Sequence, residues 1–87
     1  MSWEFELLLE PTSITEGPAW DGGGLVFTDI NRSRILRYDA TTGDITPVRT
    51  GTNRANGLMF DKQGQLYGCE QGTPDGSGGR RIVRYEA

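Results

Sequence analysis

Short apolar stretches alternate with turns rich in Gly and Asp along most of the chain. The apolar stretches are dominated by β-branched and aromatic residues, which are typical of strands. Asp21-Gly22-Gly23-Gly24 and Asp61-Lys62-Gln63-Gly64 have the composition of hairpin turns. No segment carries an apolar stripe with the 3.6-residue period of a helix. The pattern therefore predicts an all-β chain with seven strands, at residues 17–20, 25–29, 34–38, 45–49, 57–60, 65–69 and 81–85.

An eighth strand is expected at the N-terminus. Residues 3–9 alternate aromatic and acidic side chains and then become apolar. The segment ends at Glu10-Pro11, where the proline cannot donate a hydrogen bond to a neighbouring strand.

The chain also repeats itself. Pairing Glu16 with Asn56 aligns E-G-P-A-W-D with N-G-L-M-F-D, and it places Val26 opposite Leu66. After an insertion in the Gly-rich residues 72–79, R-I-L-R-Y-D is matched by R-I-V-R-Y-E. A repeat of about 40 to 47 residues is typical of propeller blades.

Counting strands suggests how the blades would be completed. Residues 14–50 would form a first blade, and residues 52–87 a second blade that lacks its outer strand. Residues 1–10 would supply that strand to a neighbouring copy, because the resulting head-to-tail contact closes only as a ring. Two copies would give four blades and three would give six, both known sizes. The alternative is that the chain is a truncated piece of a longer propeller.

Charge and composition exclude several classes of function. A net charge of −3 with scattered basic residues argues against a nucleic-acid binder. We expect no membrane association, since no apolar stretch approaches about 20 residues, and no signal peptide. A single cysteine is consistent with a cytoplasmic protein. Without histidine, catalysis would depend on carboxylates, Arg, Lys or a bound metal.

The motifs resemble the gluconolactonase and senescence-marker-protein (regucalcin) family. The motifs that carry the resemblance are E-G-P-A-W, F-T-D-I, R-I-L-R-Y-D, A-N-G-L-M-F-D, G-Q-L-Y-G-C-E and R-I-V-R-Y. The resemblance covers nearly the whole chain, which looks like the first third of such a protein. It implies a six-bladed propeller, a central divalent metal (usually calcium), and hydrolysis of sugar lactones. It therefore favours three copies, a homotrimer, over two.

The resemblance also implies roles for individual residues. Glu16 stands at the position of a metal ligand, and Arg54-Ala55-Asn56 matches a substrate-binding segment. The family's other metal ligands, an Asn and an Asp, come from later blades that this chain lacks. Glu70 stands at a position that we assign to substrate binding. Catalytic residues stay unidentified.

Position supports a channel site as well. Glu16 and Asn56 head the two inner strands, so a threefold ring would alternate carboxylate and amide oxygens around one axis. Calcium takes six to eight such oxygens. The alternatives are that Glu16 only accepts hydrogen bonds in a turn, that Asn56 forms an Asn-Gly turn, and that Arg54 is a solvated loop charge.

Other side chains are assigned to structure. We expect an inter-blade core, a polar face on the third strands, and a buried, unreactive Cys69. The expected core residues are Trp20, Phe27, Phe60 and Tyr67, and the expected polar face is formed by Arg34, Arg37, Arg81 and Arg84.

Two functions remain. The first is a metal-dependent hydrolase of lactones or esters, which the resemblance implies, with a small lactone or sugar acid as its ligand. The second is a non-catalytic binding or assembly module, or a truncated relic of a longer lactonase.

Overall fold

The computed structural model describes residues 4–10 and 14–86, which contain seven strands and a single 3₁₀ turn, Ile30–Arg32. All seven strands predicted between residues 14 and 86 are confirmed, so the all-β prediction is correct. In this part of the chain, no helix is long and apolar enough to cross a membrane. The strands are β1 (Thr15–Trp20), β2 (Gly24–Asp29), β3 (Arg34–Asp39), β4 (Ile45–Thr50), β5 (Ala55–Phe60), β6 (Leu66–Glu70) and β7 (Arg81–Tyr85).

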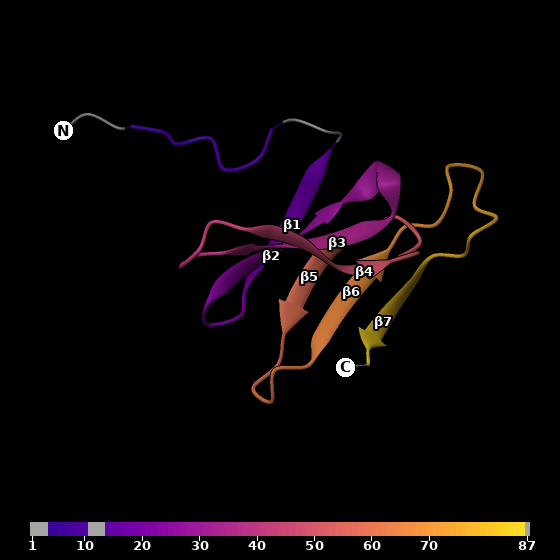
Figure 1. The fold of residues 1–87 in the computed structure, drawn as a ribbon. Helices are drawn as coiled ribbons and strands as arrows, with labels where there is room; N and C mark the ends of the chain where they lie inside the picture. Colours follow the sequence, from indigo (N-terminus) through magenta and orange to yellow (C-terminus); the bar gives the residue numbers. More distant parts are fainter. Residues whose placement is uncertain (1–3, 11–13, 87) are drawn as a thin grey trace.

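The first sheet is an antiparallel meander in the order β1-β2-β3-β4 (Figure 1). Its first hairpin is closed by Asp21, whose Oδ1 accepts hydrogen bonds from the backbone N–H groups of Gly23 (2.9 Å) and Gly24 (2.8 Å). Gly22 adopts a φ of 104° in this turn, a conformation that favours glycine. The predicted Asp-Gly turn is thus formed for the expected reason.

The second sheet is also an antiparallel meander, in the order β5-β6-β7. Asp61 repeats the role of Asp21, since its Oδ1 accepts hydrogen bonds from the N–H groups of Gln63 and Gln65. Within residues 4–10 and 14–86, no fourth strand joins β7. Residues 4–10 form no strand in the single chain, so the eighth strand, which is expected to pair with a neighbouring copy, stays a prediction.

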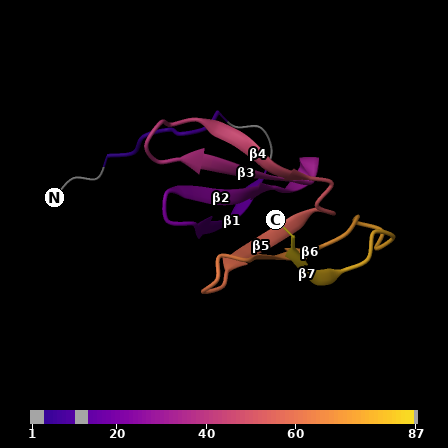
Figure 2. The ribbon, with the colours of Figure 1, turned by 60° about the horizontal axis from the view of Figure 1, so that its bottom comes forward.

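The two sheets meet through their first strands. β5 lies beside β1 and also reaches β2, and the views in Figures 1 and 2 agree on this arrangement. A small core of Val26, Ile35 and Leu66 fills the contact. Leu58, Phe60 and Tyr85 pack against this core from the second sheet. The sheets are therefore arranged as neighbouring propeller blades, with their inner strands adjacent.

Strand registers correct the alignment of the two halves. Trp20 pairs with Leu25 in the first sheet, and Phe60 pairs with Leu66 in the second. Leu66 therefore corresponds to Leu25, not to Val26, because the second hairpin turn is one residue longer. The same shift places Glu70 in the position of Asp29.

Of the four residues expected in an inter-blade core, only Phe60 packs between the two sheets of one copy. Trp20 and Phe27 lie with Leu25 on the face of the first sheet that points away from the second. Tyr67 lies on the face of the second sheet that points away from the first, because successive strand residues point to opposite faces. Trp20 is 58% exposed as a result.

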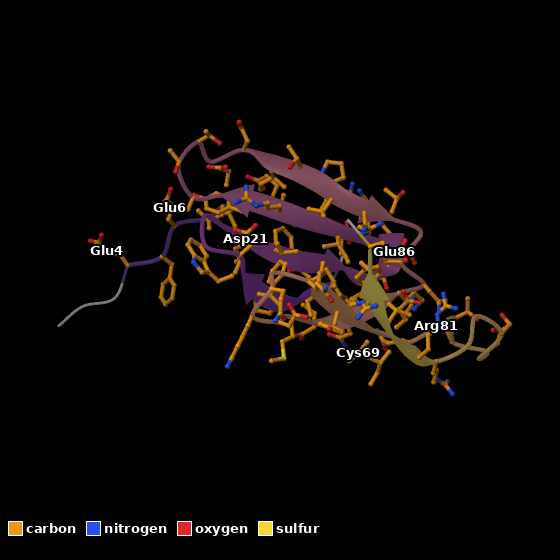
Figure 3. All side chains as sticks on the ribbon, turned by 90° about the horizontal axis from the view of Figure 1, so that it is seen from below. Glu4, Glu6, Asp21, Cys69, Arg81 and Glu86 are labelled. Carbon is orange, nitrogen blue, oxygen red and sulfur yellow. The ribbon has the colours of Figure 1, made fainter. Side chains whose placement is uncertain are left out.

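Two further expectations are wrong for the same geometric reason. Arg34 and Arg37 are three residues apart on β3, so they lie on opposite faces and do not form one polar surface. Cys69 is exposed, because it shares the outward face of the second sheet with Ile82, which is 77% exposed. In Figure 3, Cys69 lies at the lower surface of the molecule.

The N-terminal segment lies on the side of the first sheet that is remote from β7 (Figures 1 and 2). Leu8, Leu9 and Glu10 line a cleft of about 450 Å³ against this sheet. The other side of the cleft is formed by Thr15, Glu16, Pro18, Leu25, Phe27, Tyr38 and Ile45. The predicted strand at residues 3–9 thus rests in part on its own blade, and Trp3 lies outside the described residues.

Candidate functional site

The beginnings of β1 and β5 lie against one another and bring the backbones of Glu16 and Asn56 together. The hydroxyl of Thr28 lies 2.9 Å from the carbonyl oxygen of Glu16 and 3.2 Å from that of Asn56. Thr28 is fully buried, so its hydroxyl joins the two inner strands inside the molecule. The sequence prediction that both residues head inner strands is consistent with this placement.

Gly17 makes the close approach possible. The pairing of β1 with β2 is irregular between Glu16 and Ala19, and Gly17 has a φ of 58° there. A glycine in the left-handed region is a usual component of a β-bulge. A side chain at Gly17 would collide with the backbone of Asn56. The glycine of the E-G-P motif therefore determines how close the backbones of β1 and β5 are beside the two candidate ligands.

The Glu16 carboxylate lies at the surface, and its Oε1 accepts a hydrogen bond of 3.0 Å from the N–H of Gly17. This contact is the turn role considered as the alternative to metal binding. It occupies one carboxylate oxygen in a hydrogen bond to an adjacent residue. Such a contact is compatible with cation binding, because each carboxylate oxygen can accept more than one interaction.

Arg54 lies at the junction between the sheets in a left-handed conformation, with a φ of 54°. Its backbone N–H donates to Ser33 Oγ (3.0 Å), and its Nη1 donates to Asn31 Oδ1 (3.3 Å). The guanidinium is thus directed to the turn after β2 of the first blade. Its substrate role stays a prediction.

Glu70 lies at the centre of a buried hydrogen-bond network. It is 6% exposed; Oε1 accepts from Arg81 Nε (2.8 Å) and Asn53 Nδ2 (3.3 Å), and Oε2 accepts from the Tyr85 hydroxyl (3.0 Å). Burial by itself would raise the pKa of Glu70, but the three donors outweigh it and hold the pKa below its ordinary value. Burial and the bond to Glu70 raise the pKa of Tyr85. Both carboxylate oxygens of Glu70 are therefore engaged in the fold.

Sequence reasoning did not identify Asn53 and Tyr85 as partners of Glu70. The available signal was the recurrence of an acidic residue at the end of a second strand and an Arg at the start of the third. Asp29 is fully buried and binds Arg34 Nε at 2.7 Å, in the position of the Glu70–Arg81 pair. An arginine at the start of each third strand, next to an acidic residue at the end of the second, was the sign that the acidic residue could be buried.

No group of three or more His, Cys, Asp or Glu side chains gathers into a possible metal site within the described part of the chain. The side chains of Glu16 and Asn56 carry hard oxygen donors of the type that calcium prefers, so their chemistry suits such an ion. Their number is too small, since calcium takes six to eight ligands. One copy of the chain therefore provides part of a site.

The fold is similar to solved gluconolactonase structures. A gluconolactonase from Xanthomonas campestris is 30% identical, with a TM-score of 0.78, and the match covers 92% of this chain and 25% of that chain. A second structure, of a proposed gluconolactonase, is 26% identical with a TM-score of 0.74, and the match covers 92% of this chain and 26% of that chain. No family model and no curated protein sequence matches.

The resemblance seen in the sequence motifs is therefore confirmed at the level of three-dimensional structure. The two sheets of this chain are similar in fold to part of a gluconolactonase structure. The chain spans about a quarter of the length of the gluconolactonases that it matches.

Proposed function

We propose that the chain is a two-bladed module of a sugar-lactone hydrolase, and that it acts in a ring of three copies. The observation that carries the proposal is the juxtaposition of Glu16 and Asn56 at the start of adjacent inner strands. This juxtaposition occurs in a chain that matches a gluconolactonase over 92% of its length.

The ring would supply the ligands that one copy lacks. Three copies would bring three Glu16 carboxylates and three Asn56 amides to one axis, and a divalent cation, calcium by resemblance, would offset the repulsion between the carboxylates. Such an ion, when bound, would polarise the carbonyl of a lactone. Glu16 and Asn56 hold the ion in this proposal, and Asn56 also contacts the substrate.

Arg54 and Glu70 are the other proposed substrate contacts. Arg54 would donate hydrogen bonds to a hydroxyl or to developing negative charge on the substrate. Glu70 would have to exchange one of its present donors for a substrate hydroxyl. We therefore expect Arg54 to have the larger effect on substrate affinity and Glu70 the larger effect on stability.

In the proposed ring, the N-terminal segment completes the three-stranded second sheet of a neighbouring copy. β7 is the edge of that sheet in the described chain, and an unpaired edge is open to an added strand. Residues 4–10 have no strand partner of their own, so they are available for this role.

A second function is favoured by the symmetry of the proposed site. A threefold ring repeats the same two ligands, so it offers no distinct base and no distinct open coordination position. The contact between Glu16 and the Gly17 N–H also shows that this carboxylate has a structural use in one chain. A non-catalytic metal-binding or assembly module would keep the ring and the ion without hydrolysis.

The test combines molar mass, metal binding and activity. Light scattering is expected to give a species of three times 9.6 kDa, and calcium titration a single ion per ring. Gluconolactone hydrolysis, followed by acid release, should stop with chelator and in Glu16→Gln. Asp44→Asn, which removes one exposed turn carboxylate, is the matched control. A calcium-binding ring without hydrolysis supports the assembly module, and a monomer without calcium affinity contradicts both functions.

A further inference from the structure

The outward face of the second sheet is an exposed apolar surface. We call it the rear face; it comprises Met59, Tyr67, Cys69, Ile82 and Arg84. Met59 is 70% exposed and Ile82 is 77% exposed, so this surface is uncovered in one copy. The strand pairs place these side chains on one side of the sheet, opposite to Leu66 and Tyr85.

The rear face repeats, position by position, the face of the first sheet that holds the second sheet. With the corrected register, Tyr67 corresponds to Val26, Cys69 to Thr28 and Ile82 to Ile35. Val26 and Ile35 form the core of the contact between the sheets. The chain thus carries a second copy of a surface whose partner is already known from the fold.

The polar residues beside the hairpin turn of the first sheet also have counterparts beside the hairpin turn of the second sheet. In the first sheet, Arg37 Nε binds Asp21 Oδ2 at 2.6 Å next to the first hairpin turn. In the second sheet, Asp61 occupies the position of Asp21, and Arg84 that of Arg37. Asp61 Oδ2 accepts a hydrogen bond of 2.9 Å from the Tyr67 hydroxyl, so in the second sheet a tyrosine is the partner that Arg37 is in the first.

The surface that would accept the rear face of another copy lies on the first sheet. We call it the open face; it comprises Trp20, Leu25, Phe27, Tyr38 and Ile45. It repeats the face with which the second sheet contacts the first, since Leu25 corresponds to Leu66 and Tyr38 to Tyr85. Leu8 and Leu9 cover it only in part and leave the cleft of about 450 Å³.

We propose that the rear face of one copy packs onto the open face of a second copy and so repeats the contact within the chain. The inference rests on the proposed ring and identifies the surfaces that would close it. The occupant is a second copy of this chain because both halves of the contact are present on it in the same register as the internal contact. Each copy has one rear face and one open face, so the contact between copies is head-to-tail. Every rear face and every open face is covered only when the copies close into a ring.

The proposal specifies individual contacts. The internal contact of Ile35 with Leu66 becomes, between copies, a contact of Ile82 with Leu25. The side chains of Leu8 and Leu9 lie on the receiving face, so they must move when the second copy docks. Their segment would then be next to the edge strand β7 of the docked copy, where the proposed strand addition takes place.

Disulfide cross-linking tests this contact directly. In a Cys69→Ser background, Leu25→Cys with Ile82→Cys should give disulfide-linked dimers and trimers under mild oxidation. Thr41→Cys with Ile82→Cys is the control, since Thr41 lies on an exposed turn, and it should give no such species. Circular dichroism confirms that each variant keeps its β structure. An equal yield from both pairs, or no cross-linked species, overturns the proposal.

A second test of the contact uses a charge substitution and does not depend on the geometry of a disulfide. Ile82→Asp should convert the assembly to monomer, whereas Thr41→Asp should leave the molar mass unchanged. Ile82 is 77% exposed, so a charge there does not disturb the fold of one copy. An unchanged assembly in Ile82→Asp overturns the proposal while a ring still stands. Cross-linking without calcium binding or hydrolysis supports the docking contact and contradicts the proposed function.

Discussion

A Cβ atom built on Gly17 would lie 1.8 Å from the carbonyl oxygen of Asn56. No two non-bonded heavy atoms can be so close, so only glycine permits the present distance between β1 and β5. Because Gly17 follows Glu16, the same residue determines both the packing of the two blades and how close their backbones are beside the two candidate ligands.

Gly17→Ala is expected to destabilise the chain more than the conformational strain alone would. The substitution forces a positive φ on alanine, at a cost of about 1 kcal/mol, and it also forces the strands apart. Urea denaturation followed by tryptophan fluorescence measures the effect.

The control is Gly43→Ala, which also forces a positive φ (79°) on alanine but leaves the new Cβ with no atom within 4 Å. If the two variants lost equal stability, the steric contact with Asn56 would have no energetic importance.

Glu70→Gln should destabilise the fold by about 2 kcal/mol at pH 7, because it removes the charged acceptor of a buried network. The pKa of Glu70 is lowered in the fold, so its stabilisation is present above its ordinary pKa of 4.5. It is lost as the pH falls through the lower folded value. Denaturation curves at several pH values should therefore converge for the two proteins in acid.

Glu6→Gln, which changes an exposed carboxylate on the N-terminal segment, is the control for this series. A difference between Glu70→Gln and the unaltered chain that persisted at pH 2 would show that shape, and not charge, makes the network stable.

Asn53→Ala should loosen the inserted residues 72–79. The Asn53 Nδ2 lies 3.0 Å from the carbonyl oxygens of both Gly78 and Gly79, so one amide fixes the end of the insertion. Its loss should raise hydrogen exchange and protease cleavage in the insertion, with little change at β1 and β2. Asn31→Ala, in the other blade, is the comparison. Asp75 Oδ1 accepts hydrogen bonds from the Thr73 hydroxyl and from the Ser77 N–H within the insertion. Equal protection in Asn53→Ala would show that these internal bonds, and not Asn53, keep the insertion ordered.

Deleting residues 1–9 should abolish assembly, because the second sheet of each neighbour would lose its added strand. Analytical ultracentrifugation of the shortened chain should give a monomer of β structure. The full-length chain at the same concentration is the reference. A shortened chain that forms the same oligomer would contradict strand exchange but not the contact between the rear and open faces.

The sequence alone determined the strands, the turns and the family resemblance. These features are local: alternation of apolar residues gives strands, and Asp with Gly closes the hairpins. The motifs E-G-P-A-W and N-G-L-M-F-D also placed Glu16 and Asn56 at the start of inner strands, since each lies just before an apolar stretch.

Only the tertiary structure decided which face each side chain occupies. The extra residue in the turn from Asp61 to Gln65 shifts the register of β6 by one, and a shift of one moves every side chain to the other face of a sheet. The local sequence similarity between the halves conceals this shift, because it aligns Tyr67 with Phe27, whereas the strand pairing aligns Tyr67 with Val26. The partners of Glu70 come from Asn53, Arg81 and Tyr85, which are distant in the sequence and meet only through strand pairing.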